Sequence, residues 1–334
     1  MIDPFQNMKV LVTGATGFIG GHIAKTAYEA GWYTRGLRRK PNSTGHLGDL
    51  DIDWITGNLD DPESLKRAMS GVEVVFHAAA YYPTRKERLS LADYIDYARR
   101  QMDRVIRAAS RARIARLIYT SSLSTIGFPP RGSDRLADEN DYYRPGELKG
   151  SAYYESKYLM ESALLEAASG GFPAVILNPT AVFGPGDVHL TLGRLLLAAA
   201  EGRMVAWLPG IVNVIDVRDV AAAHIQAVEH GVVGERYIIG GHNLSLKEAM
   251  FEVSHVIGCK PPAFGVPMGL VNLVIYLDRL IPGVNLTGNH LAALVRWRGF
   301  DSSKAAQSLG LTTRPFSESI KDALDWFTQH GYLR

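Results

Sequence analysis

Ser122, Tyr153 and Lys157 are the residues whose types and spacing most clearly suggest chemistry. A tyrosine and a lysine four positions apart in a helix lie one turn apart on the same face. The Lys157 ammonium would then favour the phenolate and lower a phenol pKa that is ordinarily about 10. Such a tyrosine can exchange a proton with an alcohol oxygen near neutral pH, and the Ser122 hydroxyl can hold the same oxygen. These three residues form our candidate catalytic group.

A Tyr-x-x-x-Lys pair alone is usually an exposed helical pair, so its context decides the interpretation. Residues 117–122 read Leu-Ile-Tyr-Thr-Ser-Ser, which is typical of a buried strand that ends in hydroxyls. Ligands of open α/β sheets bind at the carboxyl ends of the strands. The neighbouring Tyr154 is the alternative tyrosine, but only Tyr153 has a lysine four residues later.

A glycine turn near the start of the chain predicts a dinucleotide site. Gly14 and Gly17 lie between a β-branched run at 8–13 and a helix-compatible segment at 18–30, and Gly20 is the third residue of that segment. Glycines there permit a tight turn and a close backbone approach, and the helix N-terminus attracts a pyrophosphate. The spacing is one residue longer than the usual fingerprint, and three glycines alone could be an ordinary loop. The flanking strand and helix favour the cofactor site.

Strand and helix patterns alternate through the first half of the chain. This alternation predicts an α/β fold of the Rossmann type, a doubly wound parallel sheet with helices on both faces. The expected strands are 9–13, 34–37, 53–56, 74–77, 116–121 and 174–178, and the expected helices are 18–30, 62–69, 91–112 and 151–168.

The pattern changes after Asn178, where Pro179 and the Gly-Pro-Gly run at 184–186 indicate a loop into a smaller C-terminal lobe. We expect residues 8–178 and about 212–241 to form the Rossmann domain. Residues about 179–211 and 242–334 would form the substrate-binding lobe. Segments 212–228 and 236–239 are expected to return to the main sheet.

Composition restricts the function class. The 334 residues can bury a large core, and a net charge of +2 leaves no electrostatic footprint for nucleic acid. A single cysteine, Cys259, excludes an internal disulfide and fits a reducing cytoplasm. Asp3 and Pro4 interrupt any leading apolar stretch, so we expect neither a secretory leader nor a membrane partner. No Cys, His and acidic residues group at metal-ligand spacing, so no metal is expected.

Further motifs in the expected order make the chain resemble a known family. They are Phe-His-Ala-Ala-Ala at 76–80, Tyr-Thr-Ser-Ser at 119–122, Tyr-Tyr-Glu-Ser-Lys at 153–157, Leu-Asn-Pro-Thr at 177–180, Val-Arg-Asp-Val at 217–220 and Asp-Ser-Ser-Lys-Ala at 301–305. From Met8 onward the chain resembles the extended short-chain dehydrogenase/reductase family, also called the NAD-dependent epimerase/dehydratase family. Within it the chain looks most like the dihydroflavonol-reductase-like branch, which includes the sugar epimerases associated with hopanoid gene clusters.

The resemblance implies roles for individual residues. It places Ser124 and Asn178 near the substrate, although Asn178-Pro179 could simply turn the chain, and the alanines at 78–80 could simply be a buried strand end. It implies a cofactor site made of Gly14, Thr16, Gly17, Phe18, Ile19, Gly20, Arg39, Asn58, Leu59, Ala78, Ala79, Ala80, Tyr153, Lys157, Asn178 and Pro179. Asn58 replaces the family's aspartate at the adenine contact, and its carbonyl can still accept a hydrogen bond.

The end of the second strand bears on the choice of cofactor. A carboxylate there would bind the 2′-hydroxyl of NAD and repel a 2′-phosphate. Residues 34–40 contain no acid, and Arg39 falls where NADP-binding relatives carry an arginine, which suits a phosphate. The sequence therefore favours NADP, with NAD possible; a solvated basic loop is the alternative interpretation.

Departures from the family pattern separate three related enzyme classes. Leu123 and Ser124 stand where 4,6-dehydratases carry Asp-Glu, so the acid–base pair for water elimination is missing. Val212 stands where nucleotide-sugar epimerases usually carry a diphosphate-binding arginine, although Arg194, Arg203 or Arg296 could replace it. We expect an NAD(P)-dependent reductase or dehydrogenase of a small carbonyl or secondary alcohol. The alternative is a sugar or nucleotide-sugar epimerase with retained NAD, and a non-catalytic redox sensor is the third.

The helix at 91–112 also departs from the family. Relatives carry an asparagine there that supports the lysine through a proton relay, whereas residues 98–102 read Ala-Arg-Arg-Gln-Met. The relay would have to run through Gln101, water or a backbone carbonyl. The charged surface of this helix is either a homodimer contact, as in relatives, or a solvated face.

Overall fold

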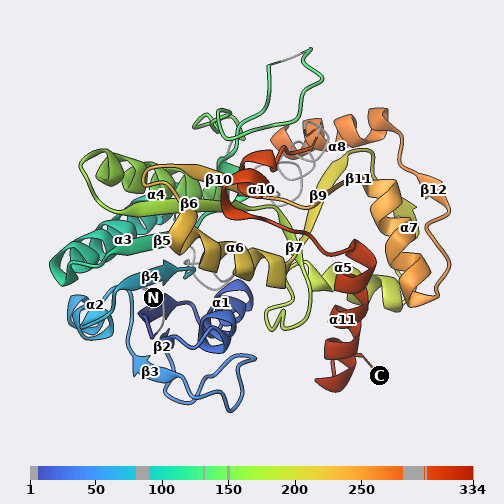
Figure 1. Cartoon of the computed structure of the whole chain (residues 1–334). Helices are drawn as coiled ribbons and strands as arrows, with labels where there is room; N and C mark the ends of the chain where they lie inside the picture. Colours follow the sequence, from blue (N-terminus) through green and yellow to red (C-terminus); the bar gives the residue numbers. More distant parts are fainter. Residues whose placement is uncertain are drawn as a thin grey trace.

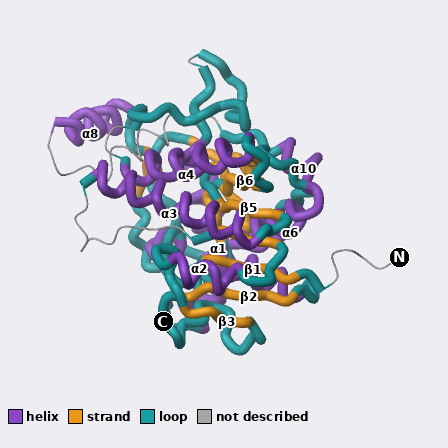
Figure 2. The backbone as a smooth tube through the Cα atoms, turned by 90° about the vertical axis from the view of Figure 1, so that its left-hand side faces the viewer, coloured by secondary structure: helices purple, strands orange, loops and turns teal. Residues whose placement is uncertain are grey.

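The central element is a parallel sheet of seven strands, in the order β10-β6-β5-β4-β1-β2-β3 (Figures 1 and 2). A computed structural model describes residues 7–79, 90–130, 132–148, 151–280, 297 and 299–333. The strands are β1 Lys9–Thr13, β2 Tyr33–Arg38, β3 Asp53–Thr56, β4 Val74–His77, β5 Arg116–Thr120, β6 Ala174–Pro179 and β10 Arg236–Ile239. The doubly wound α/β fold predicted from the sequence is confirmed.

Alternate strand residues enter two different cores, as the period of a strand requires. Val10 and Val12 of β1 belong to a core covered by α1 Phe18–Glu29 and α6 Val217–His230. Leu11 belongs to the opposite core, which three other helices cover. These are α2 Pro62–Met69, α3 Leu91–Ala112 and α4 Ala152–Ser169. The sheet is therefore buried on both faces.

The remaining elements form a smaller assembly (right of Figure 1). A third core lies among its helices and a three-stranded sheet, β11-β9-β7, and two short strands pair beside it. The elements are β7 Ala181–Phe183, α5 Gly193–Ala200, β8 Ala206–Trp207, β9 Ile211–Asp216, β11 His242–Ser245, α7 Leu246–Ile257, β12 Phe264–Gly265, α8 Met268–Leu280 and α11 Phe316–Gln329. The helix α10 Ser303–Leu309 packs instead on α6 and β10.

The expectation that segment 212–228 returns to the main sheet is wrong for its strand. β9 pairs parallel with β7 and antiparallel with β11, outside the seven-stranded sheet. The strand at the edge of the main sheet, next to β6, is β10, with Arg236 opposite Ile176. The expected return of 236–239 to this sheet is therefore confirmed. The helix that follows β9 does cover the main sheet, since α6 packs against α1.

The first glycine turn depends on close backbone contact, which predicts the effect of adding one methyl group. A Cβ on Gly20 would collide with the Gly14 carbonyl, whereas a Cβ on Gly269 of α8 meets nothing within 4 Å. Gly20→Ala should lower the free energy of unfolding by about 1–3 kcal/mol, as overpacking does. Gly269→Ala, the matched control, should be neutral or stabilise by about 0.5–1 kcal/mol. Urea unfolding without cofactor measures both, and equal effects would contradict the close-contact explanation.

Candidate active site

The glycine turn forms a cradle of backbone at the start of α1. Gly14 has φ +77°, and a Cβ there would lie 2.8 Å from the Ala79 nitrogen, so the turn lies directly against the end of β4. Gly17 is the N-cap of α1, and no side chain of the described residues caps that end. Backbone N–H groups of the first turn, at Phe18 and Ile19, are therefore available to an anion. This geometry suits a pyrophosphate.

The basic residues after β2 have different environments. Arg35 is engaged in the fold, since its Nε lies 2.7 Å from Asp53 Oδ2. The Arg38 guanidinium lies 5.1 Å from the centre of the Trp54 ring. Arg39 is exposed and forms no ion pair within the described part of the chain. Of these three, Arg39 is the exposed one, and its contact with a phosphate stays a prediction.

The other predicted adenosine and nicotinamide contacts lie at neighbouring strand ends. Asn58 and Leu59 follow β3, and the Asn58 Oδ1 accepts a hydrogen bond from the Asp60 nitrogen at 3.1 Å. Ala78 and Ala79 follow β4, with Ala79 at the glycine turn. Ala80 lies outside the described residues. The strand order brings β3 and β4 to the two sides of β1–β2, so these positions share one edge of the sheet.

Ser122, Tyr153 and Lys157 come together as expected. The Tyr153 hydroxyl donates to Ser122 Oγ at 3.0 Å, although the two residues come from α4 and from the loop after β5. Ser122 also caps the short helix Leu123–Thr125, with Oγ accepting from the Ser124 nitrogen. A hydroxyl pair at this distance can converge on one substrate oxygen. The expected register of α4 therefore brings the phenol and the serine hydroxyl into contact, and their role in proton transfer stays a prediction.

Lys157 is buried one turn after Tyr153. Its Nζ donates to the Thr120 carbonyl at 3.1 Å and lies 5.2 Å from the centre of the Tyr119 ring. Burial lowers the pKa of Lys157 to about 8, and the nearby Glu161 carboxylate opposes that shift. Gln101 does not serve the lysine in the described contacts, because its Nε2 donates to Tyr97 Oη. A backbone carbonyl, one of the anticipated alternatives, takes the ammonium's hydrogen bond.

The alternative tyrosine, Tyr154, belongs to a packed cluster. Its side chain is 5% exposed and lies near Tyr143, with ring centres 5.6 Å apart. Burial raises the pKa of Tyr154 well above its ordinary value. This environment suits a core residue rather than a proton donor at neutral pH.

Asn178 and Ser124 are more deeply buried than substrate contacts usually are. Asn178 is fully buried, and its Nδ2 donates to the Ser122 carbonyl, to Thr125 Oγ1 and to Glu161. Ser124 is 1% exposed, and its Oγ has no partner among the described residues. The Asn178 side chain braces the loop that carries Ser122. A direct role of Asn178 or Ser124 with substrate stays a prediction, as does the predicted cofactor contact of the adjoining Pro179.

Two buried residues near the candidate group escaped the motif analysis. Glu161 lies one turn after Lys157 on α4, and its Oε1 lies 2.7 Å from Arg236 Nε of β10. His224 of α6 has its Nε2 2.8 Å from Thr120 Oγ1. The carbonyl of the same threonine accepts the hydrogen bond from Lys157. Burial lowers the pKa of His224 to about 4, so this imidazole is neutral at pH 7. The i, i+4 spacing of Lys157 and Glu161 was the signal available in the sequence.

The arginines suggested as a replacement for a diphosphate clamp lie in different places. Arg203 is paired with Glu201, and Arg194 is exposed on α5. Arg296 lies outside the described residues, so a replacement clamp stays a prediction. Val212, at the position of the missing arginine, is partly buried against the core of the smaller assembly.

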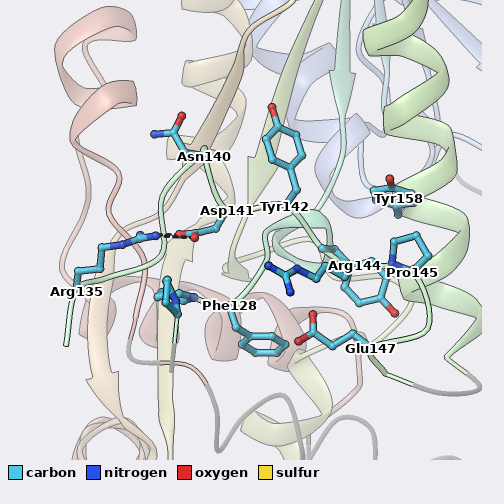
Figure 3. A pocket seen from close by; sticks show the side chains of 12 residues that line it. Phe128, Arg135, Asn140, Asp141, Tyr142, Arg144, Pro145, Glu147 and Tyr158 are labelled. Atoms are coloured by element: carbon cyan, nitrogen blue, oxygen red, sulfur yellow. Dashed lines mark hydrogen bonds and ion pairs between the residues drawn. The ribbon is translucent and has the colours of Figure 1, made fainter. Parts of the chain in front are cut away.

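A cavity of about 870 Å³ lies between the loop after β5 and Tyr158 of α4 (Figure 3). Its wall includes Phe128, Tyr142 and Arg144, with the Arg135–Asp141 ion pair at one side. Ser122, Tyr153 and Lys157 do not line it. The described residues gather no group of three or more potential metal ligands and contain no helix long and apolar enough to cross a bilayer.

The buried lysine predicts a specific dependence of stability on pH. Between about pH 8 and 10.5 the unfolded chain holds the Lys157 proton and the folded chain does not, so this group makes wild-type stability rise with pH. Lys157→Met removes that contribution. Its unfolding free energy relative to wild type should therefore fall by about 2–3 kcal/mol between pH 7 and pH 10. Urea titrations at both pH values measure this, and a constant difference would contradict the lowered pKa.

A family model and two related proteins match most of this chain. A model of the NAD dependent epimerase/dehydratase family matches residues 10–240. A Synechocystis sp. protein, provisionally named a dihydroflavonol 4-reductase, is 34% identical, covering 97% of this chain and 95% of its own. The ceramide reductase of Caulobacter vibrioides is 30% identical, and the match covers 97% of this chain and 96% of that protein.

A solved structure agrees over a similar span. A protein of Pseudomonas aeruginosa described as a nucleoside-diphosphate-sugar epimerase superposes with a TM-score of 0.83 at 26% identity, covering 98% of this chain and 99% of its own. The resemblance inferred from the motifs is thereby confirmed. The chain belongs to the NAD dependent epimerase/dehydratase family and is an NAD(P)-dependent enzyme of that family.

Proposed function

We propose that this enzyme is an NADP-dependent reductase that converts a small carbonyl compound to a secondary alcohol, and the reverse. The observation that carries the proposal is the 3.0 Å contact between the Tyr153 and Ser122 hydroxyls, with the buried Lys157 one turn away. The names of the relatives in the reductase branch support the same reaction class.

The chain's own residues would supply binding and proton transfer. When bound, the reduced nicotinamide supplies a hydride to the carbonyl carbon. Tyr153 gives its proton to the carbonyl oxygen as negative charge grows there, and Ser122 donates a hydrogen bond to that oxygen. Lys157 holds the nicotinamide ribose and favours the phenolate that remains. The N–H groups at Gly17–Gly20 would hold the pyrophosphate.

The lack of an arginine at position 212 favours a reductase over a nucleotide-sugar epimerase. Val212 offers no charge to a diphosphate, and Asn213 beside it is engaged with Thr180 Oγ1 at 2.7 Å. The epimerase remains the second candidate because of the similar Pseudomonas aeruginosa structure. A reductase releases its oxidised cofactor in every cycle, whereas an epimerase keeps it.

Three finer predictions accompany this function. We propose that the protein acts in the cytoplasm and does not bind nucleic acid. A homodimer through α3 is also a proposal, although that face carries ion pairs typical of a solvated helix, such as Arg100 with Asp96 at 2.9 Å.

The cofactor choice predicts the effect of removing Arg39. Arg39→Ala should weaken NADPH binding about tenfold to a hundredfold, because one charge-assisted contact contributes about 1.5–3 kcal/mol. NADH binding should change little, since NADH has no 2′-phosphate. Fluorescence titration of the reduced cofactors measures both affinities. Equal losses, or none, would show that Arg39 is only solvated surface.

The proton-transfer role predicts different effects for the two adjacent tyrosines. Tyr153→Phe keeps the ring but removes the transferable proton, so turnover should fall by roughly 10²–10⁴-fold with little change in cofactor affinity. The assay follows NADPH consumption with a panel of ketones.

Tyr154→Phe is the matched control and should cost far less. Loss of activity in the Tyr154 variant instead would mean that the proposed register is wrong. Full activity in both variants would mean that proton transfer does not depend on this pair.

A further inference from the structure

The strongest unexplained feature near the candidate group is the buried carboxylate of Glu161. It lies on α4 one turn after Lys157, and the residue is 3% exposed. A carboxylate in such a position needs partners, because an uncompensated buried charge is costly. Its two oxygens point to different parts of the molecule, and these directions indicate its role.

One oxygen of Glu161 faces the segment that carries Ser122. Oε2 accepts hydrogen bonds from Ser121 Oγ, from Thr125 Oγ1 at 2.7 Å and from Asn178 Nδ2 at 2.8 Å. Ser121 and Thr125 flank Ser122 on both sides. The carboxylate thus fixes both ends of the serine's loop to the helix that carries Tyr153 and Lys157.

The same contacts reach the backbone of Ser122. Its carbonyl lies 2.9 Å from Thr125 Oγ1 and 3.3 Å from Asn178 Nδ2, the two groups that also approach Glu161. Movement of Glu161 would therefore be transmitted to the serine, and hence to the 3.0 Å contact between Ser122 Oγ and the Tyr153 hydroxyl.

The other oxygen of Glu161 faces a buried cation. Oε1 lies 2.7 Å from Arg236 Nε, and the two side chains are only 4% and 2% exposed. Arg236 also donates to the Thr125 carbonyl at 2.9 Å and to the Glu139 carbonyl at 3.0 Å. The ring of Tyr142, which lines the neighbouring cavity, covers the guanidinium at 4.4 Å. Arg236 neutralises the carboxylate and holds the same loop from its other side.

We propose that Glu161, neutralised by Arg236, is the positioning residue that holds the Ser122 loop in register with Tyr153 and Lys157. This inference rests on the proposed function for the roles of those three residues. The carboxylate reaches them through Ser121, Thr125 and Asn178 rather than touching substrate. It also places a negative charge near the Lys157 ammonium.

The charged and titratable groups around Lys157 come from four elements. His77 of β4 and Tyr119 of β5 lie on one side, Tyr153 and Glu161 lie on α4, and Arg236 of β10 lies beyond the carboxylate. Burial lowers the pKa of His77 to about 3, so that imidazole is neutral. The Glu161 carboxylate is the charge that favours the ammonium form of Lys157 and raises its pKa against the effect of burial.

The test uses Glu161→Gln, which keeps the shape and removes the charge. Glu155→Gln is the matched control, because Glu155 is also buried on α4 but accepts from Tyr143 Oη and the Gly146 nitrogen instead. Hydrogen exchange of the amides at 123–126 should be about tenfold faster in Glu161→Gln, after correction for global stability, because charged hydrogen bonds to the loop are lost. Glu155→Gln should leave that segment unchanged.

A second readout is the pH dependence of NADPH binding. In Glu161→Gln the Lys157 ammonium loses its favourable charge and faces an uncompensated Arg236. The pH above which NADPH affinity falls should therefore move down by about one unit. Arg236→Met should move it up or leave it unchanged, which a merely destabilising change would not do.

The inference would be overturned if hydrogen exchange at 123–126 in Glu161→Gln were the same as in Glu155→Gln. It would also be overturned if the pH above which NADPH affinity falls moved in the same direction in Glu161→Gln and Arg236→Met. If Glu161→Gln does not fold, the double variant Glu161→Gln/Arg236→Met removes both charges and is compared by exchange with Arg236→Met. Failure of the wild type to bind NADPH would contradict the proposed function instead, and the exchange measurement would still decide this inference.

Discussion

The burial of one ammonium group is the constraint on which the rest of the site depends. Lys157 is 7% exposed, and burial pulls its pKa down to about 8. An ammonium in that environment needs an acceptor, and the Thr120 carbonyl at the end of β5 provides it. The β5 terminus must then stay in place against α4, which is also what the contact between Ser122 and Tyr153 requires.

Several parts of the fold converge on that strand end. His224 of α6 is neutral, and its Nδ1 lies 2.7 Å from the Val220 carbonyl, so Nδ1 carries the proton and Nε2 accepts from Thr120 Oγ1. From the opposite face, α4 brings the lysine itself. Thr120 is thus held from both faces of the sheet, by His224 on one side and by Lys157 on the other. The glycine turn follows β1, which lies two strands from β5 along the same edge of the sheet.

Local sequence patterns predicted the elements and the candidate group well. The run at 117–122 and the four-residue spacing of Tyr153 and Lys157 are local signals, and the structure brings these residues together. The pairing of β9 could not be read in this way, because a strand at 211–216 has the same local pattern whichever sheet it joins. Partners far apart in the chain, such as Glu161 with Arg236, leave no local signal. Asn178 was assigned by its motif, whereas its contacts are with the loop that carries Ser122.

The proposed reductase would use NADP as an exchangeable substrate, whereas an epimerase would keep NAD through each cycle. Mass spectrometry of the nucleotide released when the purified protein is denatured distinguishes the two. The reductase should release NADP(H) at well below one equivalent, removable by washing and restored by added NADPH. A full equivalent of NAD(H) that survives extensive washing would contradict the proposed reductase and favour the epimerase.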